Sequence, residues 1–454
     1  MARLALKAVA AVVAVSLAAC SDGPVQPGDL TASPDLAVAR SGAEDVVAGE
    51  VIVKLKSGAD IDEVVRKFKL ARGQSGFAGK FDVLRGVKGQ ERADAARLAA
   101  DPSVEYAEPN YLRQTTAIDS RLWAFYNPGG LNMSFYNDPS GRTGPLPSSY
   151  ASILDADEDN VEGYAAGGGD VVIGSIDTGV DFQHPEFTGR LIAGRDWVNN
   201  DNDPSDTPDE GHGTHTTGTM AGSNVGVAGV SGAAAHVKIY VQRVCGPAGC
   251  PTSAIINAIN AAADYPGMVA MNLSLGGGTE SQGEKSAISY ATSKGVLVIA
   301  SAGNSGSSKV ACPACDVNAI SVSSTTWKDE LAPYSQYGRG LDISAPGGNC
   351  YSNTTEEGCV FSSVVSGYQG GRTYTLGGNG GTYAYMQGTS MAAPQVTGTA
   401  GIVASKTGLR GSALRSRILS TADDKGANGY DTKFGSGRVN SYRAVTNTSL
   451  GAGL

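Results

Sequence analysis

One serine, two histidines and one aspartate lie in short runs of small residues whose types and spacing suit acyl-transfer chemistry. Ser390 lies in QGTSMAAPQVTG, where Pro394 is tolerated near the start of a helix. A helix start presents unpaired N–H groups and the positive end of the helix dipole, so it stabilises negative charge. Ser390 can therefore be a helix N-cap, or a nucleophile whose attack forms an anion beside those groups.

Two further clusters supply the partners that a serine nucleophile requires. Asp177 ends an apolar run in GSIDTGV, and two of the chain's 4 histidines, His212 and His215, share GHGTHTTG. A serine hydroxyl becomes nucleophilic when an imidazole takes its proton, and a carboxylate fixes the tautomer of that imidazole. Asp177 alone suits the capping of a turn equally well. The three clusters together favour acyl transfer.

Acyl transfer also requires hydrogen-bond donors for the attacked carbonyl oxygen. Asn304 in SAGNSG follows the apolar run 296–300, and its side-chain amide is suited to this role. The backbone N–H of Ser390 at the helix start is a second candidate donor. The helix start therefore both places the hydroxyl and stabilises the oxyanion.

Apolar runs separated by helical segments must position these clusters. Such alternation indicates an α/β fold with a mostly parallel sheet that helices cover on both faces. In such sheets, functional residues gather at the carboxyl ends of the strands. The predicted strands are 171–176, 237–244, 269–275, 296–300 and 319–323, and the predicted helices are 253–264 and 284–294.

A smaller module precedes this sheet. Its segments alternate in a β-α-β-β-α-β order, which predicts a small α+β module of the split βαβ type. Five of these six segments can be bounded: a strand from residue 50, a helix at 61–68, a strand at 81–87, a helix at 91–100 and a closing strand at 104–111.

The N-terminus has the pattern of an export signal. Residues 1–20, MARLALKAVAAVVAVSLAAC, contain two basic residues, a short apolar run and small residues, which indicates a signal peptide rather than a membrane span. The ending LAAC resembles a bacterial lipobox, so we predict a lipid anchor on Cys20. The alternative is ordinary cleavage with an incidental cysteine. Residues 21–45 are rich in Pro, Gly, Ala and Asp and predict a flexible linker.

The remaining six cysteines form an even set, which export favours as disulfides. Six cysteines allow fifteen connectivities, so the pairing of near neighbours is a hypothesis. The CPAC sequence also suits a redox motif or half of a zinc site, but the second CxxC of a zinc site is missing. The hypothesis pairs Cys245 with Cys250, Cys312 with Cys315, and Cys350 with Cys359.

Composition narrows the class of protein further. The chain has 454 residues with 62 glycines and only 17% charged residues, which is typical of a compact, loop-rich globular protein. A net charge of −9 argues against nucleic acid as a partner, because phosphate binding requires a basic surface. We expect a monomer that binds no nucleic acid.

Five motifs resemble the subtilisin-like serine proteases and occur in that family's order. They are IDTGVDFQHPEF, GHGTHTTGTMAG, NLSLGG, SAGNSG and GTSMAAPQVTG, and the resemblance covers nearly all of residues 117–445. It implies a subtilisin-like catalytic domain at 117–454, with a mostly parallel sheet flanked by helices and a triad in the order Asp, His, Ser.

The resemblance also implies roles for individual residues. Asp177 orients the imidazole, His212 acts as general base and then general acid, and Ser390 is the nucleophile. Asn304 is the oxyanion donor, and His215 supports the site structurally. The segment that resembles the family's substrate-binding strand comprises Ser274, Leu275, Gly276 and Gly277.

The N-terminal module, taken as residues 46–116, resembles the inhibitory prodomain of these proteases. This implies a zymogen whose prodomain assists folding, occupies the cleft with its tail and is removed by the enzyme itself. We place the cut between residues 111 and 120. The alternative is a permanent N-terminal domain.

Two segments leave the interpretation open. The loop 196–209, DWVNNDNDPSDTPD, is dense in oxygen ligands that suit structural calcium, but a solvated acidic loop has the same composition and the EF-hand pattern is absent. The insertion 349–385 is rich in Gly, Ser and Tyr and is either a wall of the cleft or a surface loop. We predict the surface loop, and we name no metal ligand.

The sequence thus predicts a secreted, lipid-anchored serine endopeptidase made as a zymogen, without a catalytic cofactor. One rival is a catalytically inactive relative that acts in binding, but Asp177, His212, Ser390 and Asn304 are all intact. Another is a metallohydrolase using His212 and His215, which the missing HExxH motif disfavours.

Overall fold

The computed structural model describes residues 46–115, 168–223, 229–230, 234, 236–326, 329–349, 359–375 and 380–447. The predicted signal peptide, the linker and Cys20 lie outside the described residues. The predicted boundaries at residues 20, 45 and 116 therefore stay predictions.

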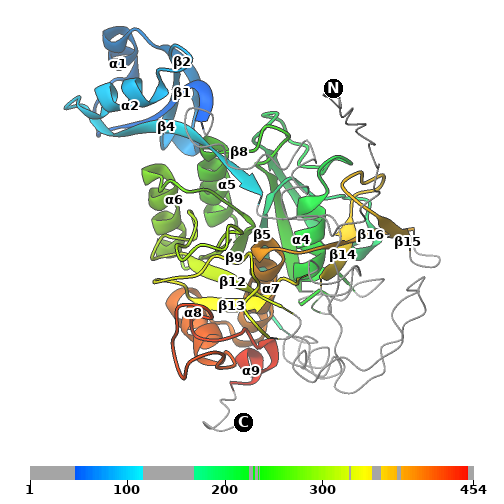
Figure 1. The fold of residues 1–454 in the computed structure, drawn as a ribbon. Coiled ribbons are helices and arrows are strands. Elements are labelled where there is room, and N and C mark those ends of the chain that lie inside the picture. The colour runs from blue at the N-terminus through cyan, green and yellow to red at the C-terminus, as the bar shows by residue number, and fades with distance from the viewer. Residues whose placement is uncertain are drawn as a thin grey trace, which may run out of the picture. The chain divides into compact units, whose positions relative to one another are not determined.

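A parallel sheet of seven strands forms the centre of the larger domain (Figure 1). Every pairing between neighbouring strands is parallel, and the order is β13-β12-β11-β9-β5-β7-β6. This confirms the predicted fold class. The strands are β5 (Val171–Asp177), β6 (Leu191–Asp196), β7 (Val237–Arg243), β9 (Met268–Leu273), β11 (Leu297–Ser301), β12 (Ile320–Thr325) and β13 (Ile343–Pro346).

Side chains of the sheet alternate between two hydrophobic clusters, one on each face. In β5, Val171 and Ile173 belong to one cluster, and Val172 and Ile176 belong to the other. Because both faces are buried, the strand is a nearly continuous apolar run. Helices α4 (His212–Ala221), α7 (Thr389–Thr407), α8 (Gly411–Ser420) and α9 (Ser441–Thr446) pack into the first cluster, and α5 (Thr252–Asp264) and α6 (Gln282–Ser293) pack into the second.

The N-terminal module has the predicted β-α-β-β-α-β order. Its sheet is antiparallel, and its two helices enclose a separate core that includes Val53, Val64 and Leu98. Asp60 begins the first helix by accepting a hydrogen bond from the N–H of Asp62. The elements are β1 (Val46–Leu55), α1 (Ile61–Phe68), β2 (Ala71–Ser75), β3 (Asp82–Arg85), α2 (Glu91–Ala99) and β4 (Val104–Thr115).

The prediction that the insertion 349–385 is a surface loop is wrong for its described part. Three antiparallel strands, β14 (Val360–Val364), β15 (Thr373–Thr375) and β16 (Thr382–Met386), form a small sheet there. Ser362 Oγ donates to His215 O of α4 at 2.8 Å, and Val360, Val364 and Met386 are buried. The composition resembled a loop, but packing against α4 makes these residues strands.

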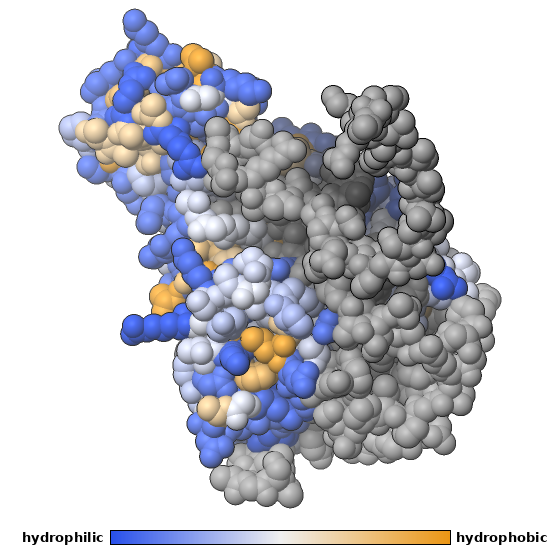
Figure 2. Space-filling model, viewed as in Figure 1, coloured by the Kyte–Doolittle hydropathy of each residue, from blue (hydrophilic) through white to orange (hydrophobic). Residues whose placement is uncertain are grey.

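Two of the three predicted disulfides are confirmed, Cys245–Cys250 and Cys312–Cys315. Cys359 is also disulfide-bonded, but Cys350 lies outside the described residues, so that pairing stays a prediction. Within the described ranges, none of the helices is both long and apolar enough to cross a membrane. On the face shown in Figure 2, the described surface is mostly polar, with hydrophobic residues in small groups.

Candidate active site

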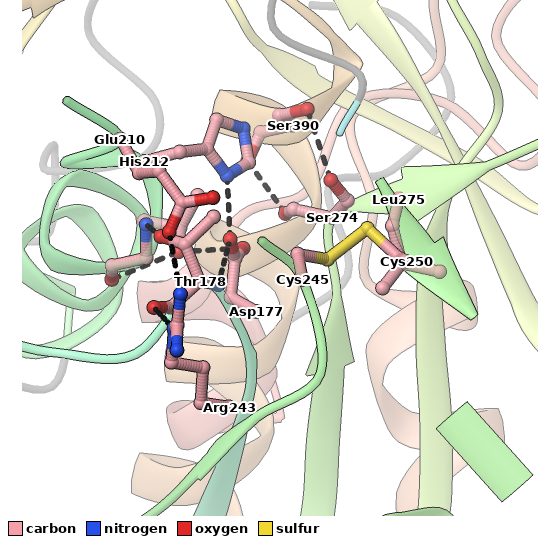
Figure 3. The surroundings of a disulfide bond; sticks show 12 residues. Asp177, Thr178, Glu210, His212, Arg243, Cys245, Cys250, Ser274, Leu275 and Ser390 are labelled. Atoms are coloured by element: carbon pink, nitrogen blue, oxygen red, sulfur yellow. Dashed lines mark hydrogen bonds and ion pairs between the residues drawn. A yellow bond between two sulfur atoms is a disulfide. The ribbon is translucent and has the colours of Figure 1, made fainter. Parts of the chain in front are cut away.

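The predicted triad residues come from three different elements. Asp177 is the last residue of β5, His212 is the first of α4, and Ser390 is the second of α7. His212 Nδ1 lies 2.6 Å from Asp177 Oδ1, and both side chains are buried (Figure 3). An ionised carboxylate only accepts hydrogen bonds, so we assign the proton to Nδ1, which leaves Nε2 as a proton acceptor.

The Asp177 carboxylate is held from both sides. Its Oδ1 accepts from the backbone N–H of Thr178 at 2.8 Å, and its Oδ2 accepts from Thr216 Oγ1 at 3.2 Å. These bonds fix the plane of the carboxylate and therefore the imidazole of His212.

Gly211 sets the start of α4 and the direction of His212. Its φ of 64° lies in the left-handed region, where a side chain would be strained. A Cβ at this position would also lie 2.5 Å from the ring of Tyr368, which belongs to the segment between β14 and β15. The insertion therefore packs directly against the residue before His212.

Ser390 forms a reciprocal contact with Ser274. Ser390 Oγ donates to Ser274 O at 3.3 Å, and Ser274 Oγ donates to Ser390 O at 2.8 Å (Figure 3). Pro394 lies in the second turn of α7, beyond the helix start, and it has no N–H for the carbonyl four residues earlier, which is that of Ser390. The Ser274 hydroxyl therefore satisfies the carbonyl that Pro394 leaves open.

His212 Nε2 is buried and has no hydrogen-bond partner among the described residues. Catalytic hydrogen bonds are often incomplete before substrate binds, so the direction of the Ser390 hydroxyl toward Ser274 does not oppose proton transfer to His212. The site therefore holds a buried proton acceptor fixed by a carboxylate.

Asn304 is oriented for donation. Its Oδ1 accepts from both the N–H and the Oγ1 of Thr389 at 2.9 Å. Its Nδ2 is buried, and no hydrogen-bond partner for it is present in the described chain. A buried amide donor without a partner is costly unless a ligand atom accepts its hydrogen bond. This arrangement fits an oxyanion donor.

His215 has a different environment from His212. Its Nε2 lies 3.1 Å from Val360 O, and burial together with the proximity of His212 lowers the pKa of His215 to about 3. The ring is therefore neutral at neutral pH and serves packing. This agrees with the supporting role that the resemblance implied.

A buried ionic cluster beside the site was missed by the sequence reasoning. Arg243 donates to Thr178 O at 3.1 Å and to Glu210 Oε2 at 3.2 Å (Figure 3). It also donates to Asp196 Oδ2 at 2.8 Å. Arg243 also lies opposite Asp177 in the β5–β7 register. Burial raises the pKa of Glu210 to about 7 despite the attraction of Arg243. The signal in the sequence was a charged residue, Arg243, within the apolar run 237–244 that predicted a strand.

The acidic loop 196–209 engages its own chain. Asp196 Oδ1 accepts from two backbone N–H groups and its Oδ2 binds Arg243, while Asp201 and Asp203 each accept from backbone N–H groups two residues further on. Among the described residues, no group of three or more His, Cys, Asp or Glu side chains could hold a metal ion. These hydrogen bonds and ion pairs engage the carboxylates of the loop, and calcium binding there stays a prediction.

The tail of β4 pairs with the predicted substrate-binding segment. Gln114 and Thr115 lie opposite Gly276 and Leu275 of β10 (Leu275–Gly276) in an antiparallel register. Leu112 and Arg113 pair with a second short strand, β8 (Cys250–Pro251). The structure thus brings Ser274, Leu275 and Gly276 to the site and occupies the strand with the module's own tail.

Two polar residues of β4 cap helices of the larger domain. The Glu108 carboxylate accepts from Ser281 Oγ, Gln282 N and Gly283 N at the start of α6, at 2.7 to 2.9 Å. Asn110 Oδ1 accepts from Ser253 N at the start of α5, at 2.9 Å. Both contacts satisfy unpaired N–H groups at helix N-termini.

A parallel α/β sheet with this Asp, His and Ser arrangement and a module tail on the adjacent strand defines a protease of the subtilisin class. The chain matches the subtilase family over residues 168–437 and the fervidolysin N-terminal prodomain over residues 32–110. The chain belongs to the subtilase family and is a subtilisin-like serine protease with an N-terminal prodomain.

Individual relatives agree with this assignment. A thermophilic serine proteinase of Bacillus sp. (strain AK1) is 35% identical over 406 residues, which cover 88% of each chain. Thermitase of Thermoactinomyces vulgaris is 38% identical over 281 residues, 62% of this chain and 90% of thermitase. The crystal structure of fervidolysin from Fervidobacterium pennivorans, a keratinolytic enzyme related to subtilisin, has a TM-score of 0.69 at 26% identity. That match covers 91% of this chain and 63% of fervidolysin.

Proposed function

We propose that this protease cleaves peptide bonds within proteins through a triad of Asp177, His212 and Ser390. The observation that carries the proposal is the 2.6 Å bond between His212 Nδ1 and Asp177 Oδ1, together with the buried Nε2 that has no partner among the described residues. This is the arrangement that lets an imidazole accept a serine proton.

The reaction proceeds through an acyl-enzyme. Ser390 Oγ attacks the scissile carbonyl carbon while its proton passes to His212 Nε2, and Asp177 stabilises the resulting imidazolium. The imidazolium then donates this proton to the leaving amine, which departs and leaves the acyl group on Ser390. A water attacks the ester, giving its proton to His212, and the acid product is released as Ser390 regains a proton. These steps use only residues of the chain and water, so we propose no catalytic cofactor.

The negative oxygen of each tetrahedral intermediate is stabilised by Asn304 Nδ2 and the backbone N–H of Ser390. The first donor is aimed by Thr389, and the second lies in the first turn of α7, where the helix dipole favours negative charge. The backbone groups of Ser274, Leu275, Gly276 and Gly277 bind the extended substrate by strand pairing.

The N-terminal prodomain inhibits the enzyme before maturation. Its tail pairs with β10 as a substrate would, and Glu108 and Asn110 attach the same strand to α6 and α5. We propose that Ser390 of the same chain cuts the tail and that the prodomain then dissociates.

Export and anchoring belong to the same proposal. The LAAC sequence supports lipidation of Cys20, which would hold the protease at the cell envelope as a monomer. Incorporation of labelled palmitate, lost in Cys20→Ser, would support the anchor, and equal labelling of both chains would contradict it. Calcium binding by the loop 196–209 predicts a rise of Tm with added calcium, and an unchanged Tm would contradict it.

The experiment that tests the protease function is labelling with a fluorophosphonate, followed by peptide mass spectrometry. We expect label on Ser390 of the matured wild type and none in Ser390→Ala. A folded, matured wild type that takes no label would favour the alternative, a catalytically inactive relative that acts in binding.

A further inference from the structure

The two disulfides that lie wholly within the described residues each contact one of the two short strands that hold the β4 tail. Cys250 is the first residue of β8, and Gly277, which follows β10, pairs with Cys312 through two backbone hydrogen bonds of 2.8 and 2.9 Å. We call β8 and β10 the channel strands, because the tail residues 112–115 pair with them.

Strand β8 is too short to hold its own position. It has two residues, and its strand partner within the described chain is the β4 tail. Two residues form too few ladder hydrogen bonds for independent stability. When the prodomain leaves, the position of β8 therefore depends on α5, which follows it, on the short turn 246–249, which precedes it, and on the disulfide that closes this turn.

The Cys245–Cys250 disulfide connects β8 to the backbone of Asp177. Gly246 and Gly249 close the intervening turn with two hydrogen bonds, and Cys245 N donates to Asp177 O at 3.2 Å. Cys245 and Cys250 are 1% and 0% exposed and belong to the same hydrophobic cluster as Leu275 of β10 (Figure 3). The disulfide is thus a buried link between one channel strand and the triad backbone.

The Cys312–Cys315 disulfide braces the other channel strand. It closes a tight loop in which Cys315 N donates to Ala311 O, and Ala311 N donates to Ala302 O beside Asn304. Since Cys312 pairs with Gly277, this loop connects the end of β10 to the segment that carries the oxyanion donor. The two disulfides therefore fix one channel strand each.

We propose that these two disulfides position the channel strands for extended peptide substrates. They do not touch the reacting atoms, so the four cysteines are positioning residues. The proposal rests on the proposed function and deepens it. The disulfides determine how much binding free energy the enzyme obtains from substrate residues other than the residue next to the scissile bond. Losing a link frees its strand, so an extended substrate must order that strand when it binds.

The test compares a four-residue peptide p-nitroanilide with a single-residue ester. We expect Cys245→Ala/Cys250→Ala to raise KM for the peptide on the order of tenfold, the cost of ordering a short segment. The kcat/KM for the ester and the rate of fluorophosphonate labelling should stay within about twofold, since neither reagent spans β8. In Cys312→Ala/Cys315→Ala, we expect a KM effect in the same direction.

Equal losses on the peptide and the ester would overturn the proposal, because they would indicate a general effect on folding. Unchanged KM for the peptide in both variants would also overturn it. A wild type without any labelling would instead contradict the proposed function, so the two failures are distinguishable.

A second measurement uses the wild-type enzyme and tests the proposal even where the cysteine variants fail to fold. The matured wild-type enzyme is titrated with dithiothreitol, which reduces a disulfide to two thiols while forming its own cyclic disulfide. Alkylation and mass spectrometry then identify which pairs are open. A rise in peptide KM that follows opening of Cys245–Cys250 or Cys312–Cys315, with constant ester kcat/KM, supports the proposal. Constant peptide KM after both pairs have opened overturns it.

Discussion

Glu108 of the prodomain accepts a hydrogen bond from Ser281 Oγ, the N-cap of α6, at 2.7 Å. The same carboxylate accepts from the next two backbone N–H groups, so one prodomain side chain caps a helix of the protease. Hydrogen bonds to a charged group contribute about 1.5–3 kcal/mol each when buried. This contact should therefore account for much of the affinity between the prodomain and the protease.

We expect Glu108→Ala to release the prodomain sooner after the chain is cut. Loss of about 1.4 kcal/mol is tenfold in affinity, so the active enzyme should emerge from the full chain at least severalfold faster. The measurement is the time course of peptide hydrolysis after refolding. The control is Glu105→Ala on the same strand, whose exposed side chain pairs with Lys54 within the prodomain. Equal time courses for the two variants would show that the cap does not hold the prodomain.

The register of the β4 tail predicts where the chain is cut. Thr115 lies opposite Leu275 of β10. The residue before Leu275 is Ser274, whose carbonyl oxygen accepts a hydrogen bond from the Ser390 hydroxyl. An antiparallel tail therefore approaches the nucleophile one or two residues beyond Thr115. We expect the mature N-terminus at residue 117 or 118, as read by N-terminal sequencing of the enzyme after folding. A first residue upstream of 115, or beyond 120, would contradict this register.

The sequence indicated the candidate site because its residues lie in short motifs at the ends of elements. Asp177 ends a buried strand, and His212 and Ser390 begin helices, so short patterns specify both the residue and its position. Five of the seven strands of the sheet were predicted for a related reason, since strands buried on both faces are continuous apolar runs, whereas β6 and β13 were not predicted.

What the sequence did not predict depends on contacts between distant segments. Arg243 reaches Glu210 and Asp196 through folding alone, since these residues lie far from it along the chain. The β14–β16 sheet buries Val360 and Val364 in a cluster that includes Met391 of α7, and its serines bond to α4, which are partners that composition cannot reveal. Both the ionic cluster of Arg243 and the β14–β16 sheet form because folding buries segments that are distant in the sequence against one another.

Asn304→Ala should slow the chemical step without preventing substrate binding. Thr389 holds the Asn304 side chain through Oδ1, and Nδ2 would act on charge that develops only in the transition state, so kcat should fall while KM changes little. Removal of one such donor in subtilisin, a member of the same family, costs about 10²–10³ in kcat, and we expect the same order here. Steady-state kinetics of the matured variant test this. A loss confined to KM would argue against the oxyanion role.

Arg243→Met should destabilise the protease domain. It removes the only charge partner shown for Asp196 and Glu210 in the described structure and leaves Asp196 as a buried carboxylate without a cation, which costs about 3–5 kcal/mol. Urea unfolding in a Ser390→Ala background, which prevents self-digestion, measures the change. Arg195→Met is the control, because Arg195 is only half-buried and its exposed hydrogen bonds go to Asn200 and Asn202 rather than to a carboxylate. If Arg195→Met lowered the free energy of unfolding as much as Arg243→Met, the result would contradict a specific role for the buried ion pairs.

The stability of the domain should depend on the protonation of Glu210. Burial raises its folded-state pKa from 4.5 to about 7, so the folded state binds this proton more tightly than the unfolded state. The contribution of Glu210 to the free energy of unfolding is therefore greatest below about pH 4.5 and falls as the pH rises toward 7. Glu210→Gln, which cannot ionise, should lose less stability over that interval than the parent. Thermal unfolding of both chains between pH 4.5 and 8, again with Ser390→Ala, measures the difference. Parallel pH profiles for the two chains would mean that Arg243 keeps Glu210 ionised throughout.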